Sequence, residues 1–406
     1  MKPGDPNWFD VEAAGRPKIL ILGGYYPPAK RAGGPTRSVY EMTRNLSPYA
    51  FYVYCRDREF GTREKLPGIT SNQWQKKGQA WVFYASFLRR TAPAILQLVE
   101  NMRPDAIYIC SFFAREPTIQ LLCLRRMGLV QRIPLIIAPR GEFSAGALSL
   151  KPKRKRIYLG FAKLLDLGRG LSWHAASPEE VESIRRVVGA KSEVILAPNF
   201  PPTPSAEVVK CHAPKQEGRA RLIFLSRISP KKNLLGALEI LSRVQAPVCL
   251  DIYGPIEDPA YWALCQRSLR ELPKHVTTFY RGSVDPDAVS GIMSQYDALL
   301  LPTLGENYGY VIVESWASAT PVLVSDRTPW TDLEVVRAGW SIPLENPLLF
   351  ARRIDQLAEM TETEHAEWRS GSLDRLRRLQ EEDLEEAYAR LFSSAIASSK
   401  NRGMDE

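Results

Sequence analysis

The sequence contains little of what marks a secreted, membrane-spanning or metal-stabilised protein. No continuous apolar segment occurs in the first sixteen residues, and no later run approaches the roughly 18 apolar residues of a membrane span. Scattered cysteines without a CxxC pair are typical of free thiols in a reducing compartment. We therefore expect a cytoplasmic protein without a structural metal. The six cysteines are Cys55, Cys110, Cys123, Cys211, Cys249 and Cys265.

Acidic residues are scarce in the first half of the chain. Residues 1–200 carry 31 Lys and Arg against 16 Asp and Glu, a net charge of +15, whereas residues 201–406 carry 23 against 29, a net charge of −6. A basic half suits nucleic acid, anionic lipid or a phosphorylated substrate, and composition does not choose between them. The 406 residues, 45% of them apolar, exceed one ordinary domain, so we expect two.

Short apolar runs alternate with helical patterns along both halves. Runs of this kind, separated by helices, indicate parallel strands that are buried on both faces of a sheet. We therefore predict the α/β class, with two Rossmann-like, doubly wound parallel-sheet domains. The boundaries follow the composition: residues 1–200 form an N-terminal domain, the Pro-rich residues 201–218 a linker, residues 219–371 a second domain, and residues 372–406 a charged helix that packs back on the first domain. The predicted strands are 18–24, 51–57, 81–86, 105–111, 134–141 and 193–200, then 221–228, 248–254, 276–282, 296–303, 321–326 and 340–345.

The dinucleotide fingerprint GxGxxG is absent, which argues against a nicotinamide or flavin enzyme. Instead, Gly33 and Gly34 precede Pro35, a residue suited to the first turn of a helix, so bare backbone N–H groups could meet an anion there. A flexible turn is an equally good interpretation of these glycines. In SRISPKKN, residues 226–233, cations stand at the start of a predicted helix, against its dipole, which favours an anion site over a solvated basic turn.

Two carboxylates with seven residues between them lie in GENYGYVIVESWASATPVLVSD, residues 305–326. Glu306 falls in the loop after a predicted buried strand, and Glu314 falls inside an apolar helix. Because burying an unpaired carboxylate is costly, Glu314 needs partners or a ligand. Its two oxygens suit the vicinal hydroxyls of a sugar, although a core glutamate bonded to backbone or Arg is the alternative.

Three further motifs have simpler explanations. Asp285-Pro286-Asp287 resembles a metal-binding DxD, but helix capping explains it better, and we propose no metal site. His174, in an apolar strand, is expected to be a core residue. The basic run KPKRKR, residues 151–156, is either a solvated helix face or a contact for anionic lipid or an acceptor diphosphate.

The order of these motifs resembles retaining glycosyltransferases of family 4, which have the GT-B fold. The matching segments are the glycine turn, SRISPKKN, IYGP (252–255), RGSV (281–284) and the two-glutamate stretch, and the resemblance spans nearly the whole chain. The segment 326–344 resembles enzymes of bacterial capsule and exopolysaccharide synthesis.

The resemblance implies a donor site for a nucleotide-diphosphate sugar, no cofactor and no metal. Arg227 and Lys232 would hold and stabilise the diphosphate, Glu306 would meet the donor sugar, and Glu314 would accept the ribose hydroxyls. The implied roles toward the diphosphate and the sugar make Arg227, Lys232 and Glu306 the candidate catalytic residues. The implied donor-binding residues are Gly33, Gly34, Arg227, Lys232, Glu306, Asn307, Tyr308, Gly309, Tyr310 and Glu314.

Two positions depart from the family pattern. Arg140 stands in APRGEF where many relatives have a histidine, and with Glu142 it forms a possible acceptor-side segment. Ala319 stands where a glycine is usual.

The expected function is metal-independent, retaining sugar transfer to a saccharide or polyprenyl-diphosphate-linked acceptor. We expect it in the cytoplasm, possibly peripheral at an anionic membrane surface, and without a nucleic-acid partner. A paired-carboxylate glycoside hydrolase is disfavoured because it has no use for cations around a diphosphate. The alternatives are a non-catalytic nucleotide-sugar-binding scaffold and a GT-B epimerase or phosphorylase.

Overall fold

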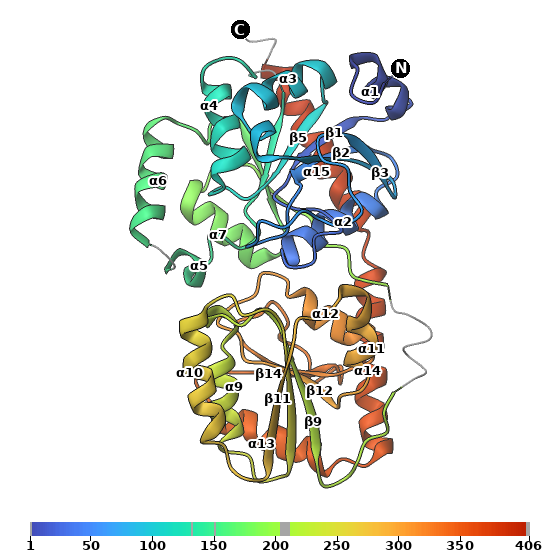
Figure 1. Cartoon of the computed structure of the whole chain (residues 1–406), viewed down its shortest axis with the longest axis vertical. Coiled ribbons are helices and arrows are strands. Elements are labelled where there is room, and N and C mark those ends of the chain that lie inside the picture. Colours follow the sequence, from blue (N-terminus) through green and yellow to red (C-terminus); the bar gives the residue numbers. More distant parts are fainter. Residues whose placement is uncertain (1, 131–132, 150–151, 204–211, 403–406) are drawn as a thin grey trace. The chain divides into compact units, whose positions relative to one another are not determined.

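The computed structural model describes residues 2–130, 133–149, 152–203 and 212–402, and the chain divides into two units (Figure 1). The first unit comprises residues 1–200 and 383–406, and the second comprises residues 201–382. Residues 204–211 of the predicted linker lie outside the described residues, as does Lys151 of the basic run. Among the described residues, no helix is long and apolar enough to cross a membrane.

In the described part of the first unit, an eight-stranded sheet has the order β3-β4-β2-β1-β5-β6-β7-β8. The pairing of β3 with β4 is antiparallel, and every other pairing in this sheet is parallel. The strands are β1 (Lys18–Leu22), β2 (Ala50–Arg56), β3 (Trp74–Lys77), β4 (Ala80–Ala85), β5 (Ala106–Cys110), β6 (Leu135–Ala138), β7 (Leu171–Ala175) and β8 (Val194–Leu196).

Strand β1 shows why this sheet is covered on both faces. Leu20 and Leu22 belong to one apolar cluster, whereas Ile19 and Ile21 belong to another. Successive side chains of a strand point to opposite faces, so helices must cover both. The second cluster includes Leu384 to Ala395 of α15 (Leu384–Arg402), which packs on the face of Ile19 and Ile21. The other helices of this unit are α1 (Pro6–Ala13), α2 (Gly34–Asn45), η1 (Phe87–Arg89), α3 (Ala92–Met102), η2 (Arg115–Ile119), α4 (Gln120–Arg126), α5 (Ala145–Ser149), α6 (Pro152–Leu164) and α7 (Pro178–Val188).

The second unit contains a six-stranded sheet in the order β11-β10-β9-β12-β13-β14, counted over the residues that the structure describes, with every pairing parallel. Its strands are β9 (Ala220–Leu225), β10 (Val248–Tyr253), β11 (Val276–Gly282), β12 (Ala298–Leu301), β13 (Val322–Ser325) and β14 (Gly339–Ile342). Helices flank this sheet on both sides in Figure 1. They are η3 (Pro230–Lys232), α9 (Leu234–Leu241), α10 (Pro259–Arg270), η4 (Pro286–Ala288), α11 (Val289–Met293), α12 (Tyr310–Ala317), α13 (Pro347–Glu359) and α14 (Glu362–Gln380).

The predicted fold class of two doubly wound α/β domains is confirmed, and each predicted apolar run contains a strand. The sequence did not predict β3, because WQKK is short and mostly polar and pairs on one side only, at the edge of the sheet. The single helix predicted over residues 372–406 is wrong. The chain there forms two helices, since α14 ends at Gln380 and Asp383 Oδ1 accepts the backbone N–H of Glu386 at 2.9 Å, which begins α15.

Candidate functional site

The loop after β9 carries the predicted cations. Lys232 ends the short helix η3, and Asn233 alone separates it from α9. Asn233 fixes this turn, because its side chain accepts the N–H of Gly236 at 3.2 Å and donates to the carbonyl of Pro302 at 2.8 Å. Since Pro302 follows β12, the neighbour of β9 in the sheet, the turn holds two strand ends together.

Lys232 and Glu306 form an ion pair at the ends of these two strands. Lys232 Nζ lies 2.5 Å from Glu306 Oε1, and the side chains are only 13% and 9% exposed. Thr303 strengthens the pair, because its hydroxyl lies 3.1 Å from both Glu306 Oε1 and the carbonyl of Lys231. The backbone N–H of Glu306 donates to the carbonyl of Arg327 at 2.9 Å, which fixes the loop to the segment after β13. The structure thus unites two residues that are 74 positions apart.

Arg227 is also paired with an acid. It follows β9, and its partner Glu257 follows the neighbouring strand β10. Its Nη1 lies 2.9 Å from Glu257 Oε1, and the two side chains are 35% and 36% exposed. The sequence interpretation treated Arg227 and Lys232 as cations that await an anion. In the structure each has a carboxylate partner, so an anion that bound here would have to share or displace that carboxylate.

The pKa of the Glu306 carboxyl shows which effect prevails in this pair. Burial alone would raise the pKa, but the charge and hydrogen bond of Lys232, the charge of Lys231 and the hydroxyl of Thr303 together hold it below its ordinary value. Glu306 is therefore a carboxylate at neutral pH and accepts hydrogen bonds.

The loop after Glu306 rests on aromatic side chains. Tyr308 and Tyr310 are buried, with ring centres 4.9 Å apart, and Trp330 packs against Tyr308 while its Nε1 donates to the Tyr308 carbonyl at 2.6 Å. Gly309 precedes α12 with a φ of 75°, and a side chain there would press on Ile312. Glycine is thus required for the turn that separates Asn307 and Tyr308 from α12.

Glu314 lies on α12, the helix that begins directly after this turn. Its neighbours Val313 and Ser315 are buried, but Glu314 itself is only partly buried. The sequence pattern, which placed Glu314 inside an apolar helix, therefore overstated how deeply this carboxylate is buried. The 3.6-residue period leaves one edge of α12 open even though most of its residues are apolar.

The departure at Ala319 has a conformational explanation. Its φ is 50°, in the left-handed region that favours glycine, and the residue is buried between α12 and β13. A glycine at this position would adopt the same φ without the strain that alanine carries.

Gly33 and Gly34 lie in the first unit at the start of α2, with Pro35 in the first turn, as predicted. Gly33 has a φ of 73°, and its carbonyl accepts the N–H of Thr36 at 3.1 Å. The helix N-terminus is thus formed, and a role for it toward the diphosphate remains a prediction.

Arg140 and Glu142 follow β6 in the first unit, and both side chains bind groups of that unit. Arg140 donates to Asn199 Oδ1 and to the Tyr108 hydroxyl, each at 2.5 Å. Glu142 accepts the Ser111 hydroxyl at 2.5 Å and the N–H of Phe112 at 2.7 Å, which fixes the loop after β5. An acceptor contact through these two residues therefore remains a prediction, and their present contacts hold loops in place.

Two simpler predictions are confirmed. His174 is 1% exposed in β7, where its Nδ1 lies 2.7 Å from the Tyr108 hydroxyl and its Nε2 lies 2.7 Å from the Ala197 carbonyl. Asp285 caps η4, since its side chain accepts the N–H of Asp287. Sequence reasoning missed Thr303, Trp330 and Ser325, whose hydroxyl donates to the Thr303 carbonyl at 2.6 Å. The position of Thr303, directly after the buried run ALLLP, was the available signal.

Comparison with known proteins addresses the fold and the second unit. Residues 219–360 match a family model described as Glycosyl transferases group 1, and the comparison with curated proteins gave no match. Sucrose-phosphate synthase from Thermosynechococcus elongatus has a TM-score of 0.70 at 16% identity, over 94% of this chain and 100% of that chain. HepE from Anabaena, in complex with UDP and glucose, has a TM-score of 0.65 at 16% identity, over 93% and 100%.

The chain has the GT-B fold. A third GT-B neighbour, α,α-trehalose-phosphate synthase (UDP-forming) from Burkholderia xenovorans in complex with glucose-6-phosphate, has a TM-score of 0.66 at 10% identity, over 94% and 100%. The segment that matches the family model contains Arg227, Lys232, Glu306 and Glu314. Together the model and the fold support a glycosyltransferase.

Replacing Glu306 by Gln should remove a pH-dependent part of the stability. A carboxyl whose pKa lies below its ordinary value stabilises the fold above that value, and this contribution is lost as the pH falls through the folded pKa. Urea unfolding should show the wild type more stable than Glu306→Gln by on the order of 1 to 3 kcal/mol at pH 7. The difference should shrink once the pH falls below the ordinary value of 4.5.

The control is Glu257→Gln, which breaks the more exposed pair with Arg227 and should cost less than about 1 kcal/mol. A difference between wild type and Glu306→Gln that stays constant from pH 7 to pH 3 would contradict the assigned ion pair.

Proposed function

We propose that this chain is a retaining, metal-independent glycosyltransferase of the family 4 type. It transfers a sugar from a nucleotide-diphosphate donor to a saccharide or polyprenyl-diphosphate-linked acceptor during the synthesis of a bacterial surface polysaccharide such as capsule or exopolysaccharide. The protein works in the cytoplasm, at the inner face of the membrane.

The observation that carries the proposal is the Lys232–Glu306 pair inside the domain that matches the glycosyltransferase model. It stands at the carboxyl ends of β9 and β12, the edge of a parallel sheet where ligands bind. HepE, a similar structure, holds UDP and glucose. A donor of that class combines the groups that this site suits: a diphosphate for cations, a sugar for the Glu306 loop, and a ribose diol for Glu314.

Lys232 can serve Glu306 and a diphosphate together. An ammonium group has three N–H donors, and the 2.5 Å contact with Glu306 uses one of them. The charges of the pair also need little rearrangement when a ligand binds, because the turn at Asn233 and the hydroxyl of Thr303 already fix both side chains. Preorganised charge of this kind stabilises a leaving diphosphate better than mobile charge does.

The chemical step needs no protein nucleophile. The bond between the sugar carbon and the diphosphate oxygen breaks, and the acceptor hydroxyl oxygen forms a new bond to the same carbon on the same face. The departing diphosphate takes the hydroxyl proton. Arg227 and Lys232 stabilise the charge on the diphosphate, and Glu306 stabilises the positive charge that develops on the sugar.

Helix α6 carries the membrane part of the proposal. Ile157, Phe161 and Leu164 are 74%, 47% and 81% exposed and recur at helical spacing, so they form one apolar stripe. Exposed cations flank this stripe, whereas Lys155 turns inward and donates to the carbonyl of Ala147 at 2.6 Å. Such a helix suits the surface of an anionic bilayer. The exposed cations are Lys153, Arg154, Arg156 and Lys163.

The two glutamates should affect different halves of the donor. Glu314→Gln should weaken binding of the bare nucleoside diphosphate, because a neutral amide is a poorer acceptor for the ribose hydroxyls. Glu306→Gln should leave that affinity within about threefold and lower kcat and kcat/KM by the same factor, as expected for a contact that matters in the transition state. Calorimetric titration and steady-state kinetics measure the two effects.

Circular dichroism and urea unfolding first establish that both variants are folded. Full turnover in Glu306→Gln, or normal nucleotide affinity in Glu314→Gln, would refute this division of roles.

Vesicle binding should depend on the cations of α6. The variant Lys153→Gln, Arg154→Gln, Arg156→Gln should sediment less with anionic vesicles, because its binding free energy should fall by roughly 1 kcal/mol for each charge removed. Added salt should weaken vesicle binding of the wild type toward the level of this variant. The matched control, Arg185→Gln, Arg186→Gln, Lys191→Gln, removes the same charge from α7 and the loop after it and should bind as the wild type does. Equal losses in both variants, or binding that ignores the anionic lipid content, would disprove this role of α6.

A further inference from the structure

A pocket of about 250 Å³ lies in the first unit, separate from the residues assigned above. Tyr25 follows β1, Arg56 ends β2, and Arg90 follows β4 and η1, so the pocket lies at the carboxyl ends of three neighbouring strands. Ligands of parallel sheets bind at this edge. We call it the arginine pocket and define it by Tyr25, Arg56, Asp57, Arg58, Glu59 and Arg90, which are among its lining residues.

The acids of the arginine pocket are bound by the protein itself. The Glu59 carboxylate accepts the backbone N–H groups of Lys30 at 2.8 Å, Arg31 at 3.1 Å and Phe60 at 2.8 Å. The Asp57 carboxylate is 2% exposed and accepts the Ser71 hydroxyl at 2.8 Å.

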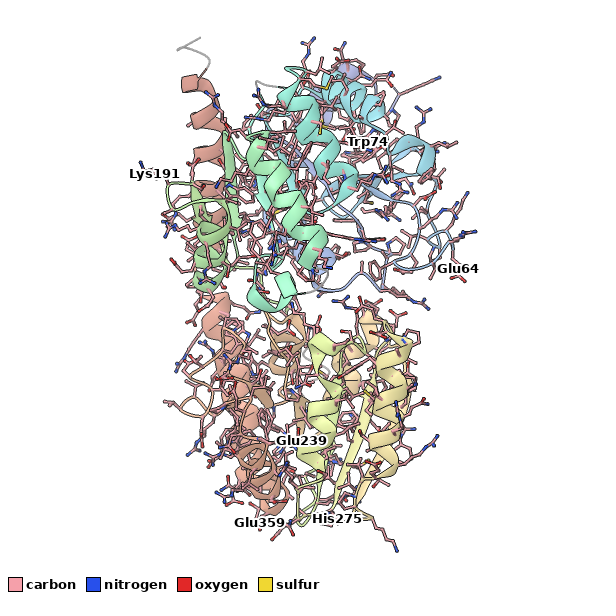
Figure 2. All side chains as sticks on the ribbon, turned by 90° about the vertical axis from the view of Figure 1, so that its left-hand side faces the viewer. Glu64, Trp74, Lys191, Glu239, His275 and Glu359 are labelled. Carbon is pink, nitrogen blue, oxygen red and sulfur yellow. The ribbon has the colours of Figure 1, made fainter. Side chains whose placement is uncertain are left out.

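A third acid on the same loop, Glu64, is exposed and points away from the first unit (Figure 2). Among the described residues, Arg58 is the one pocket arginine paired with any of these three carboxylates, since its Nε lies 3.7 Å from Asp57 Oδ1.

The arginines keep unused donors. Within the part of the chain that the structure describes, Arg56 forms no ion pair with a carboxylate. Its Nη1 lies 3.5 Å from the Tyr25 hydroxyl and its guanidinium lies 5.6 Å from the centre of the Tyr25 ring, a contact that orients the group and leaves most N–H bonds open.

Arg90 is less exposed and only partly neutralised. Its side chain is 16% exposed, and Nη1 lies 3.1 Å from Glu116 Oε2. Even so, its Nε is buried without a hydrogen-bond or ion-pair partner among the described residues. A buried donor without a partner is costly, and a bound anion would satisfy it.

We infer that the arginine pocket binds the phosphate group of a phosphorylated saccharide. This inference rests on the proposed function, because the saccharide is the acceptor of the transferred sugar. A phosphate carries close to two negative charges and three acceptor oxygens, which suits two guanidinium groups better than the two oxygens of a carboxylate do. Tyr25 offers an aromatic face beside the charged group for the sugar ring. The phosphate belongs either to a soluble sugar phosphate or to a lipid-linked sugar diphosphate.

Hydrogen exchange on the full chain locates the binding. Glucose 6-phosphate represents the soluble source, geranyl diphosphate the lipid-linked source, and glucose is the control without phosphate. We expect at least one phosphorylated probe to protect the amides of residues 53–62 and 86–92, and glucose to protect neither segment. The stronger probe identifies the source. Absence of protection by both phosphorylated probes would overturn the inference.

Substitutions then assign the contact to the arginines. Arg56→Gln should weaken the affinity for the phosphorylated probe, measured by the protection of residues 53–62, by about tenfold or more, because a charge-assisted hydrogen bond is lost. Arg56→Lys should lose less of this affinity. Arg89→Gln removes the same charge from an exposed residue outside the pocket lining and should match the wild type. Equal losses in Arg56→Gln and Arg89→Gln, or none in Arg56→Gln, would refute the assignment.

Failure of this inference is distinguishable from failure of the proposed function. Exchange requires no turnover, so protection of residues 53–62 supports the pocket even in a chain that transfers no sugar. Conversely, sugar transfer in a chain whose residues 53–62 are unprotected rejects the pocket alone.

Discussion

The candidate site of the second unit depends on one constraint: a lysine and a glutamate are held together at the ends of two neighbouring strands. Lys232 and Glu306 are 2.5 Å apart and nearly buried. An ion pair of this kind is costly to desolvate, and it is tolerated where further hydrogen bonds complete it. Thr303 supplies such a bond. The pair keeps a carboxylate charged inside the proposed donor site.

This arrangement explains why cations and acids occur together at the sheet edge. Free lysine and arginine side chains would repel one another before a diphosphate arrived, and their flexible positions would have to be fixed on binding. Pairing Lys232 with Glu306, and Arg227 with Glu257, removes both difficulties. The arginine pocket of the first unit follows the opposite arrangement, because its acids are bound by backbone and hydroxyl groups and its guanidinium groups retain donors.

Much of the fold was predictable from the sequence, because strands buried on both faces appear as short, nearly continuous apolar runs. The edge strand β3 and the break between α14 and α15 escaped, since a polar edge and a charged helix boundary leave no apolar pattern. The sequence also indicated Lys232 and Glu306 separately. Their pairing depends on β9 and β12 being neighbours, which no local pattern encodes. The partial exposure of Glu314 depends likewise on which edge of α12 the rest of the unit leaves uncovered.

The most direct test is a double-mutant cycle on nucleoside diphosphate affinity with Lys232→Ala, Glu306→Gln and the double variant. If Glu306 holds part of the charge of Lys232, removing Glu306 frees that charge for the diphosphate. Lys232→Ala should then cost more affinity in the Glu306→Gln background than in the wild type, with a coupling at the lower end of the usual range of about 0.5 to 3 kcal/mol, since Glu306→Gln alone should change the affinity by no more than about threefold. Additive losses, with no coupling outside experimental error, would show that the two residues do not act on the ligand through one another and would contradict the account.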